Sequence, residues 1–211
     1  MEIDNLPIIS TSGIAVDIDE TLSWTVGYVM EQMQKLFGNP ENISVREMVA
    51  KYRYTQNVPY WQSEDALRWT KENRMSNELQ RALPLIENAD IYLHEIHKIV
   101  PVAAYITMRP QAVLEGTADW LRGHTFPEAP IICMPDNIKF EEGIAWKGTL
   151  LGKLYPAVKG IIDDNAGLLK HLPADYEGII FVYDHAQIDS LLNAVPCKDW
   201  QAVYEEIRKR F

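Results

Sequence analysis

The chain has 211 residues, of which 47% are hydrophobic and 24% are charged. This length suits one domain, or one domain with a large insertion, and the composition excludes a fibrous or wholly disordered protein. The chain has 30 acidic residues against 20 Lys and Arg, a net charge of −10, so the overall basic charge typical of proteins that bind nucleic acid polymers is absent. An acidic protein that binds an anionic substrate needs a local cation, either a metal ion or a well-placed Lys or Arg.

The two cysteines and the first residues bear on the cellular compartment. Cys133 and Cys197 do not have the spacing of a zinc site or a disulfide framework, which favours a reducing compartment. The N-terminal residues are acidic and lack the basic and apolar regions of a signal peptide, and no apolar run approaches the ~18 residues of a membrane span. We therefore expect a cytoplasmic protein with no membrane partner, whose oligomeric state the sequence leaves open.

Five short apolar runs predict the strands of a buried sheet. They cover residues 14–16, 102–106, 131–134, 160–162 and 179–183. Each run is continuous rather than alternating, which is typical of parallel strands covered on both faces. Helical patterns follow three of these strands, at 111–122, 165–171 and 199–209. The pattern predicts an α/β core, a Rossmann-like parallel sheet of about five strands with helices on both faces.

The stretch between the first two predicted strands contains only helical patterns. One of them opens with Ser44 and Glu47 in the S-x-x-E spacing of a capping box, in which each side chain binds a backbone N–H of the other residue. We expect residues 1–22 and 101–211 to form the core, and residues 23–100 to form an all-helical cap inserted after the first strand.

Polar side chains gather where three of the predicted strands end. They are Asp17 and Asp19 after the first strand, Thr107 and Arg109 after the second, and Asp163 and Asp164 after the fourth. In open parallel sheets, ligands bind just outside the carboxyl ends of the strands. Asp and Thr also follow strands as turn formers, but carboxylates packed together raise one another's pKa values unless a cation neutralises them. Because Mg²⁺ takes oxygen ligands, including one or two carboxylates, the cluster predicts a Mg²⁺ site.

The same residues carry a resemblance to the haloacid dehalogenase superfamily. Residues 17–21 match its D-x-D-x-T motif, Thr107 at the end of an apolar strand resembles its second motif, and the pair Asp163-Asp164 resembles its fourth. The helical insert soon after the first motif is similar to the superfamily's caps. The layout most resembles the 5′(3′)-deoxyribonucleotidase group, including a lysine, Lys153, ten residues before the acidic pair.

The resemblance implies a phosphoaspartyl mechanism of phosphate transfer. Asp17 would attack phosphorus as the nucleophile, and Asp19 would protonate the leaving alcohol and then activate water. Thr107 and Lys153 would bind the phosphoryl oxygens and stabilise charge in the transition state.

The resemblance also implies which residues hold the Mg²⁺ cofactor. Asp163 and Asp164 would bind or orient the ion, together with Asp17 and the backbone carbonyl of Asp19. Glu20 lies inside the first motif, where many relatives have a different residue, and we give it no catalytic role.

Two of these assignments have competing interpretations. Lys147, in a glycine-rich stretch, is the main rival of Lys153 as the motif lysine, and Lys159 is a weaker one; the interval to Asp163 favours Lys153. Arg109 either contacts the substrate or pairs with a carboxylate at the mouth of the site.

Together these features predict a Mg²⁺-dependent phosphomonoesterase that acts on a small phosphorylated metabolite, with a (deoxy)nucleoside monophosphate as the leading substrate. Most aromatic residues of the cap are expected to form its own core, and Trp24, the one nearest the first motif, is the candidate for contact with the substrate. The alternatives are a phosphatase of sugar phosphates or other small organic phosphates, and a non-catalytic binding protein on the same scaffold. The intact set of motif residues argues against the non-catalytic alternative.

Overall fold

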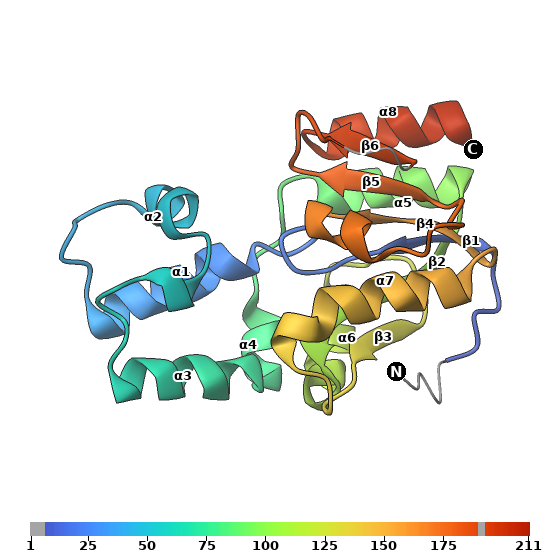
Figure 1. Cartoon of the computed structure of the whole chain (residues 1–211). Helices are drawn as coiled ribbons and strands as arrows, with labels where there is room; N and C mark the ends of the chain where they lie inside the picture. The colour runs from blue at the N-terminus through green and yellow to red at the C-terminus, as the bar shows by residue number, and fades with distance from the viewer. Residues whose placement is uncertain (1–6, 190–192) are drawn as a thin grey trace.

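A six-stranded parallel sheet forms the centre of the computed structural model, which describes residues 7–189 and 193–211 (Figure 1). The strands lie in the order β3-β2-β1-β4-β5-β6. Their bounds are Gly13–Val16 for β1, Val102–Pro110 for β2, Ile131–Met134 for β3, Val158–Asp163 for β4, Ile179–Tyr183 for β5 and Ala194–Cys197 for β6. The first five confirm the predicted strands. The sixth escapes prediction because Pro196 interrupts a short apolar run; an edge strand tolerates a residue that cannot donate to the ladder.

Eight α-helices accompany the sheet in the described residues. Their bounds are Thr25–Phe37 for α1, Val45–Tyr52 for α2, Glu64–Arg74 for α3, Asn77–Ala82 for α4, Ala89–Ile99 for α5, Leu114–Gly123 for α6, Gly143–Leu154 for α7 and Trp200–Arg210 for α8. The helix predicted at 165–171 is a 3₁₀ helix, η4, at Ala166–His171. Across the described ranges, the helices are all too short or too polar to span a membrane.

Helices cover both faces of the sheet, as predicted. Consecutive residues of a strand point to opposite faces. Ile14 and Val16 of β1 accordingly pack with residues of α4, α5, α6 and α8, whereas Ala15 packs with α7 and η4. All three side chains are fully buried, which explains why the strand forms a continuous apolar run in the sequence.

A separate group of helices, α1 to α3, lies beside the sheet (Figure 1), and we refer to this group as the cap. The cap has its own hydrophobic core, made by Met30, Met33, Met48, Val58, Trp61 and Ala66. Tyr52, Tyr60 and Trp69 pack against this core, as expected for most of the cap's aromatic residues. The predicted capping box begins α2, with Glu47 N–H donating to Ser44 Oγ at 3.3 Å and Ser44 N–H donating to the Glu47 carboxylate at 2.8 Å.

The cap is smaller than the predicted span of residues 23–100. Leu79 of α4 and Leu93 and Ile96 of α5 are buried in the same cluster as β1, not in the core of the cap. Helices α4 and α5 therefore belong to the layer that covers the sheet. The sequence does not distinguish a helix of the cap from a helix that covers the sheet, because a helix packed on a sheet and a helix packed on other helices have the same apolar periodicity.

Backbone hydrogen bonds join the chain just before α1 to the chain just after α4. Trp24 N–H donates to Pro84 O at 2.9 Å, and Ile86 N–H donates to Leu22 O at 2.8 Å, around an antiparallel bridge. The segment that contains α1 to α4 therefore begins and ends at one place.

Candidate active site

The candidate site lies at the carboxyl ends of β1, β2 and β4, which are neighbours in the middle of the sheet. Asp17 directly follows β1, and its N–H donates to Ile162 O of β4 at 2.9 Å. Arg109 lies near the end of β2, and Asp163 is the last residue of β4. The parallel topology therefore brings the predicted strand-end residues to one edge of the sheet.

Three carboxylates converge around a buried ammonium group. Side-chain oxygens of Asp17, Asp163 and Asp164 lie within 4.8 Å of one another. Lys147 Nζ lies 2.7 Å from Asp17 Oδ1 and 2.8 Å from Asp163 Oδ2. Burial opposes the charge of Lys147, but the two carboxylates outweigh this effect and raise its pKa above the ordinary value.

The charge of Lys147 does not fully compensate the negative charges of the three carboxylates. Burial, with the negative charges of Asp163 and Asp19, raises the pKa of Asp17 to about 7 against the opposing effect of Lys147. Burial and the neighbouring carboxylates also raise the pKa of Asp164 well above its ordinary value. Carboxylate oxygens are ligands that Mg²⁺ prefers, so the donor set of Asp17, Asp163 and Asp164 fits this cation.

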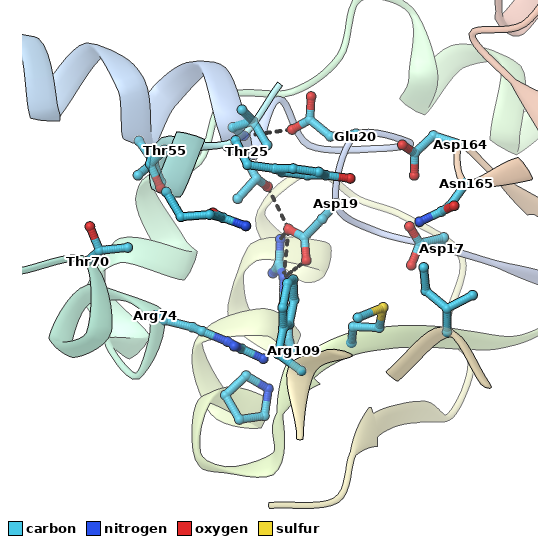
Figure 2. A pocket seen from close by; sticks show the side chains of 18 of the residues that line it. Asp17, Asp19, Glu20, Thr25, Thr55, Thr70, Arg74, Arg109, Asp164 and Asn165 are labelled. Carbon is cyan, nitrogen blue, oxygen red and sulfur yellow. Dashed lines mark hydrogen bonds and ion pairs between the residues drawn. The ribbon is translucent and has the colours of Figure 1, made fainter. Parts of the chain in front are cut away.

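The second carboxylate of the first motif is held by an arginine. Arg109 Nη2 lies 2.7 Å from Asp19 Oδ1 and Nε lies 3.1 Å from Asp19 Oδ2, while Thr25 Oγ1 donates to Asp19 Oδ1 at 2.5 Å (Figure 2). Burial alone would raise the pKa of Asp19, but Arg109 and Thr25 outweigh it and hold the pKa below the ordinary value. Arg109 thus pairs with a carboxylate, the second of its two predicted arrangements, and the side chain of Asp19 is not part of the three-carboxylate cluster.

Arg109 also connects the site to the core and to the base of the cap. Its Nη1 donates to Thr117 Oγ1 of α6 at 3.2 Å, and its Nη2 donates to Ser23 Oγ at 3.0 Å. The guanidinium lies 5.9 Å from the centre of the Trp120 ring. A side chain held on so many sides, and only 4% exposed, has little freedom to reorient.

Two threonine hydroxyls support the loops of the site. Thr107 is fully buried in β2, where its Oγ1 accepts the Arg109 N–H at 3.2 Å. Thr21, the last residue of the first motif, accepts the Asp164 N–H at 3.2 Å and so joins the loops that follow β1 and β4.

The Glu20 side chain links the first motif to helix α1 of the cap. Its φ of 59° lies in the left-handed region, which is uncommon for residues other than glycine. The carboxylate accepts the Val26 N–H in the first turn of α1 at 2.6 Å, and burial raises its pKa to about 7. This contact gives Glu20 a structural role, and its side chain also lines the cavity beside the carboxylates.

A cavity of about 490 Å³ opens between the carboxylate cluster and the cap (Figure 2). The core lines it with Asp17, Asp19, Arg109, Lys147, Asp163 and Asp164, and the cap lines it with Tyr54, Thr55, Gln56, Thr70, Asn73 and Arg74. Apolar walls come from Val26, Val29, Leu79, Met108, Ile144 and Leu168. Arg74 extends from α3 towards Arg109 (Figure 2), with its guanidinium 4.2 Å from the centre of the Phe140 ring. Thr107 is not among the lining residues.

The structure corrects the position predicted for the motif lysine. Lys153 is exposed in the last turn of α7 and does not line the cavity, whereas Lys147 lies in the site. The two lysines are six residues apart, so they are separated by about 9 Å along the helix and point about 120° apart. The exposed Lys159 on β4 is outside the site as well.

The structure also corrects the placement of Trp24. The Trp24 ring covers Gly27, where an added Cβ would meet it at 2.0 Å, and it does not line the cavity. Arg74 and Gln80, which do line the cavity, are missed by the sequence analysis. No pattern in the sequence distinguishes polar residues that face a cavity from those on an ordinary helix surface.

The fold is shared with solved structures of haloacid dehalogenase superfamily members. A Thermotoga maritima protein assigned as a beta-phosphoglucomutase is similar over 95% of this chain and 100% of its own, with a TM-score of 0.60 and 14% sequence identity. An L-2-haloacid dehalogenase from Xanthobacter autotrophicus, with chloropropionic acid covalently bound, covers the same shares of the two chains, with a TM-score of 0.53 and 13% identity. No protein-family model and no curated protein matches the sequence. These similarities establish an α/β fold of the haloacid dehalogenase type.

Proposed function

We propose that the protein is a Mg²⁺-dependent phosphomonoesterase of the haloacid dehalogenase type that forms a phosphoaspartate intermediate on Asp17. The observation that carries the proposal is the convergence of Asp17, Asp163 and Asp164 around buried Lys147 at the carboxyl end of a parallel sheet. The second Asp of the motif also favours phosphate transfer, because a proton donor for the leaving alcohol is needed there.

Asp17 is the proposed nucleophile. A carboxylate oxygen forms a bond to phosphorus while the bond from phosphorus to the alcohol oxygen breaks, which leaves the phosphoryl group on Asp17. Lys147 orients the carboxylate through its 2.7 Å contact, and its charge stabilises the phosphoryl oxygens. Thr107 is the proposed further donor to these oxygens, and because its hydroxyl is buried and does not line the cavity, this role requires the end of β2 to shift when the phosphoryl group binds. Mg²⁺ held by Asp17, Asp163 and Asp164, with the Asp19 carbonyl, would neutralise charge on the phosphoryl group.

Asp19 is the proposed general acid and base. Protonated Asp19 gives its proton to the departing alcohol oxygen, and its carboxylate then takes a proton from the water that attacks phosphorus and restores Asp17. Because Arg109 holds the pKa of Asp19 below its ordinary value in this structure, Asp19 must take up that first proton when the substrate phosphate binds. The bonds from Arg109 and Thr25 define the position from which Asp19 acts.

The proposed substrate is a small phosphorylated metabolite such as a (deoxy)nucleoside monophosphate. A cavity of about 490 Å³ with apolar walls and a tyrosine, Tyr54, has room for a sugar and a base beside the phosphate. The ten-residue interval between lysine and Asp163 no longer supports the resemblance to the 5′(3′)-deoxyribonucleotidase group, because the lysine in the site lies 16 residues before Asp163. The nucleotide preference therefore depends on the cavity.

Phosphate release from a panel of nucleoside monophosphates, sugar phosphates and other small phosphomonoesters tests the proposal. Release should require Mg²⁺, stop with EDTA, and be absent from Asp17→Asn, which should keep the fold because the side chains have the same shape. Lys153→Met serves as the matched control and should retain full activity. Substantial Mg²⁺-dependent release by Asp17→Asn would refute the nucleophile, and no release from any compound by the folded wild-type protein would favour a binding protein.

A further inference from the structure

Gln80 of α4 lines the cavity, and its side chain carries a buried acceptor atom that no protein group satisfies. It is 4% exposed, and among the described residues no donor lies within hydrogen-bonding distance of its Oε1. Buried side-chain acceptors are rarely left in this state, because they lose hydration without compensation. The other such groups in the described ranges belong to Asn39, Tyr60, Trp146 and Tyr176, and none of these residues lines the cavity.

Helix α4 holds Gln80 in a fixed position relative to the sheet. Asn77 Oδ1 accepts the Gly116 N–H of α6 at 2.6 Å, and Arg81 Nε donates to the Asp119 carboxylate of α6 at 2.6 Å. The two helices approach so closely that a Cβ on Gly116 would lie 2.4 Å from Asn77 O. Helix α4, which carries Gln80, is therefore fixed to the same core as the carboxylate cluster and not to the cap.

The chemistry of this acceptor restricts what it can bind. A carboxamide oxygen only accepts hydrogen bonds, so its partner must be an N–H or O–H group. Leu79 beside it, and Val26 and Val29 of α1, line the cavity with apolar surface. A ligand group that combines apolar surface with an N–H or O–H donor matches these surroundings.

We propose that Gln80 is a specificity-determining residue that accepts a hydrogen bond from an N–H or O–H group on the alcohol part of the substrate. This inference rests on the proposed phosphatase function, in which the phosphate lies at Asp17. In a nucleoside monophosphate the donor belongs either to the base or to a sugar hydroxyl. A leaving group without a donor leaves Oε1 unpaired, and the site discriminates against it for that reason.

Gln80→Leu tests the proposal, because leucine has a similar size and forms no side-chain hydrogen bonds. For uridine 5′-monophosphate, we expect kcat/KM to fall about 10- to 100-fold, mainly through KM. For phenyl phosphate, whose alcohol part has no donor once esterified, we expect no change. The melting temperature should stay the same or rise, because the variant removes an unpaired buried polar group, whereas loss of a merely structural residue would lower it.

Two modified nucleotides identify the source of the donor. N3-methyluridine monophosphate lacks the base N–H, and 2′,3′-dideoxyuridine monophosphate lacks the sugar hydroxyls. The analogue that lacks the donor should show, with the wild-type enzyme, the same low kcat/KM that uridine 5′-monophosphate shows with Gln80→Leu. Gln201→Leu, the same change on the exposed surface of α8, is the control and should alter none of these values.

The outcomes separate this inference from the function on which it rests. An equal effect of Gln80→Leu on both esters, or none on either, would overturn the role of Gln80 while the phosphatase function stands. Absence of phosphate release from every ester by the wild-type protein would overturn the phosphatase function and, with it, the inference.

Discussion

Replacing Lys147 with methionine should both destabilise the protein and stop phosphate release. Methionine keeps much of the length of the lysine side chain and removes the charge that lies between Asp17 and Asp163. Two buried carboxylates would then face each other without a compensating ammonium group. The change therefore tests the electrostatics of the site and the identity of the motif lysine together.

The contacts of Lys147 set the size of the effect. The ammonium lies 2.7 and 2.8 Å from the two carboxylates, and the side chains of Lys147, Asp17 and Asp163 are 5%, 7% and 1% exposed. Hydrogen bonds to charged groups contribute about 1.5–3 kcal/mol each, and loss of one partner of a buried ion pair costs about 3–5 kcal/mol. We expect the free energy of unfolding to fall by about 4 kcal/mol. Since domains are typically stable by about 5–15 kcal/mol, the variant should remain folded with little stability in reserve.

Urea unfolding followed by tryptophan fluorescence measures this change. The comparison should be made in EDTA, so that no divalent cation replaces the missing charge. Lys153→Met is the control, and as a surface change it should alter the free energy of unfolding by less than about 0.5 kcal/mol. Adding Mg²⁺ should raise the free energy of unfolding of Lys147→Met more than that of the wild-type protein, because in the variant the ion does not compete with an ammonium group.

Lys147 has two proposed roles, in stability and in phosphate release, and each can be contradicted separately. Equal unfolding midpoints for the two lysine variants in EDTA would contradict the buried ion pairs. Phosphate release that survives Lys147→Met within about tenfold, or that is lost in Lys153→Met, would contradict the assignment of Lys147 as the group that stabilises the phosphoryl charge, whose loss should cost about 100-fold or more.

Three further predictions concern Asp19, Arg109 and the cysteines. Asp19→Asn should slow hydrolysis of alkyl phosphates far more than that of p-nitrophenyl phosphate, whose leaving group needs no proton; equal losses in steady-state assays would count against a general acid. Arg109→Met should lower the free energy of unfolding by about 2–4 kcal/mol, because it leaves Asp19 and two hydroxyl groups without their partner; an unchanged calorimetric melting temperature would show that these bonds contribute little. Burial raises the pKa of Cys133 to about 11 and that of Cys197 to about 12, so iodoacetamide at about pH 8 should label both thiols only in unfolded protein. Because these pKa values are raised on folding, this contribution to stability is complete below about pH 9 and is lost as the pH rises towards 11 to 12. Rapid labelling of the native protein would contradict the burial.

The sequence predicts the sheet and the carboxylates of the site well because both depend on local signals. A continuous apolar run followed by Asp17, or by Asp163, defines a buried parallel strand and its carboxyl end in a few residues. Once the strands are parallel and adjacent, the meeting of these side chains follows from topology. Their catalytic and metal-binding roles are still predictions.

Features that depend on tertiary packing cannot be predicted from local signals in the sequence. Helix α7 contains three glycines, which weaken the helical signal, so the interval to Asp163 favours Lys153 where the geometry of the helix brings Lys147 to the site. Helices α4 and α5 look like cap helices because no strand separates them from α1 to α3. The role we propose for Gln80 depends on what surrounds it in space, and a glutamine in a short helix carries no such signal in the sequence.

The hydrogen bonds at the base of the cap have a consequence for how the sheet assembles. Roughly 85 residues separate Val16 of β1 from Val102 of β2, and closing so long a loop before the strands pair costs more chain entropy than closing a short one. Once the segments around Leu22 and Ile86 are paired, the chain that remains to be closed is only about a quarter as long, which lowers the cost by about 1 kcal/mol. Neighbouring strands of the sheet can then meet across the base of the insertion, so the cost that depends on the size of the insertion arises when the segments around Leu22 and Ile86 pair and not when β1 meets β2.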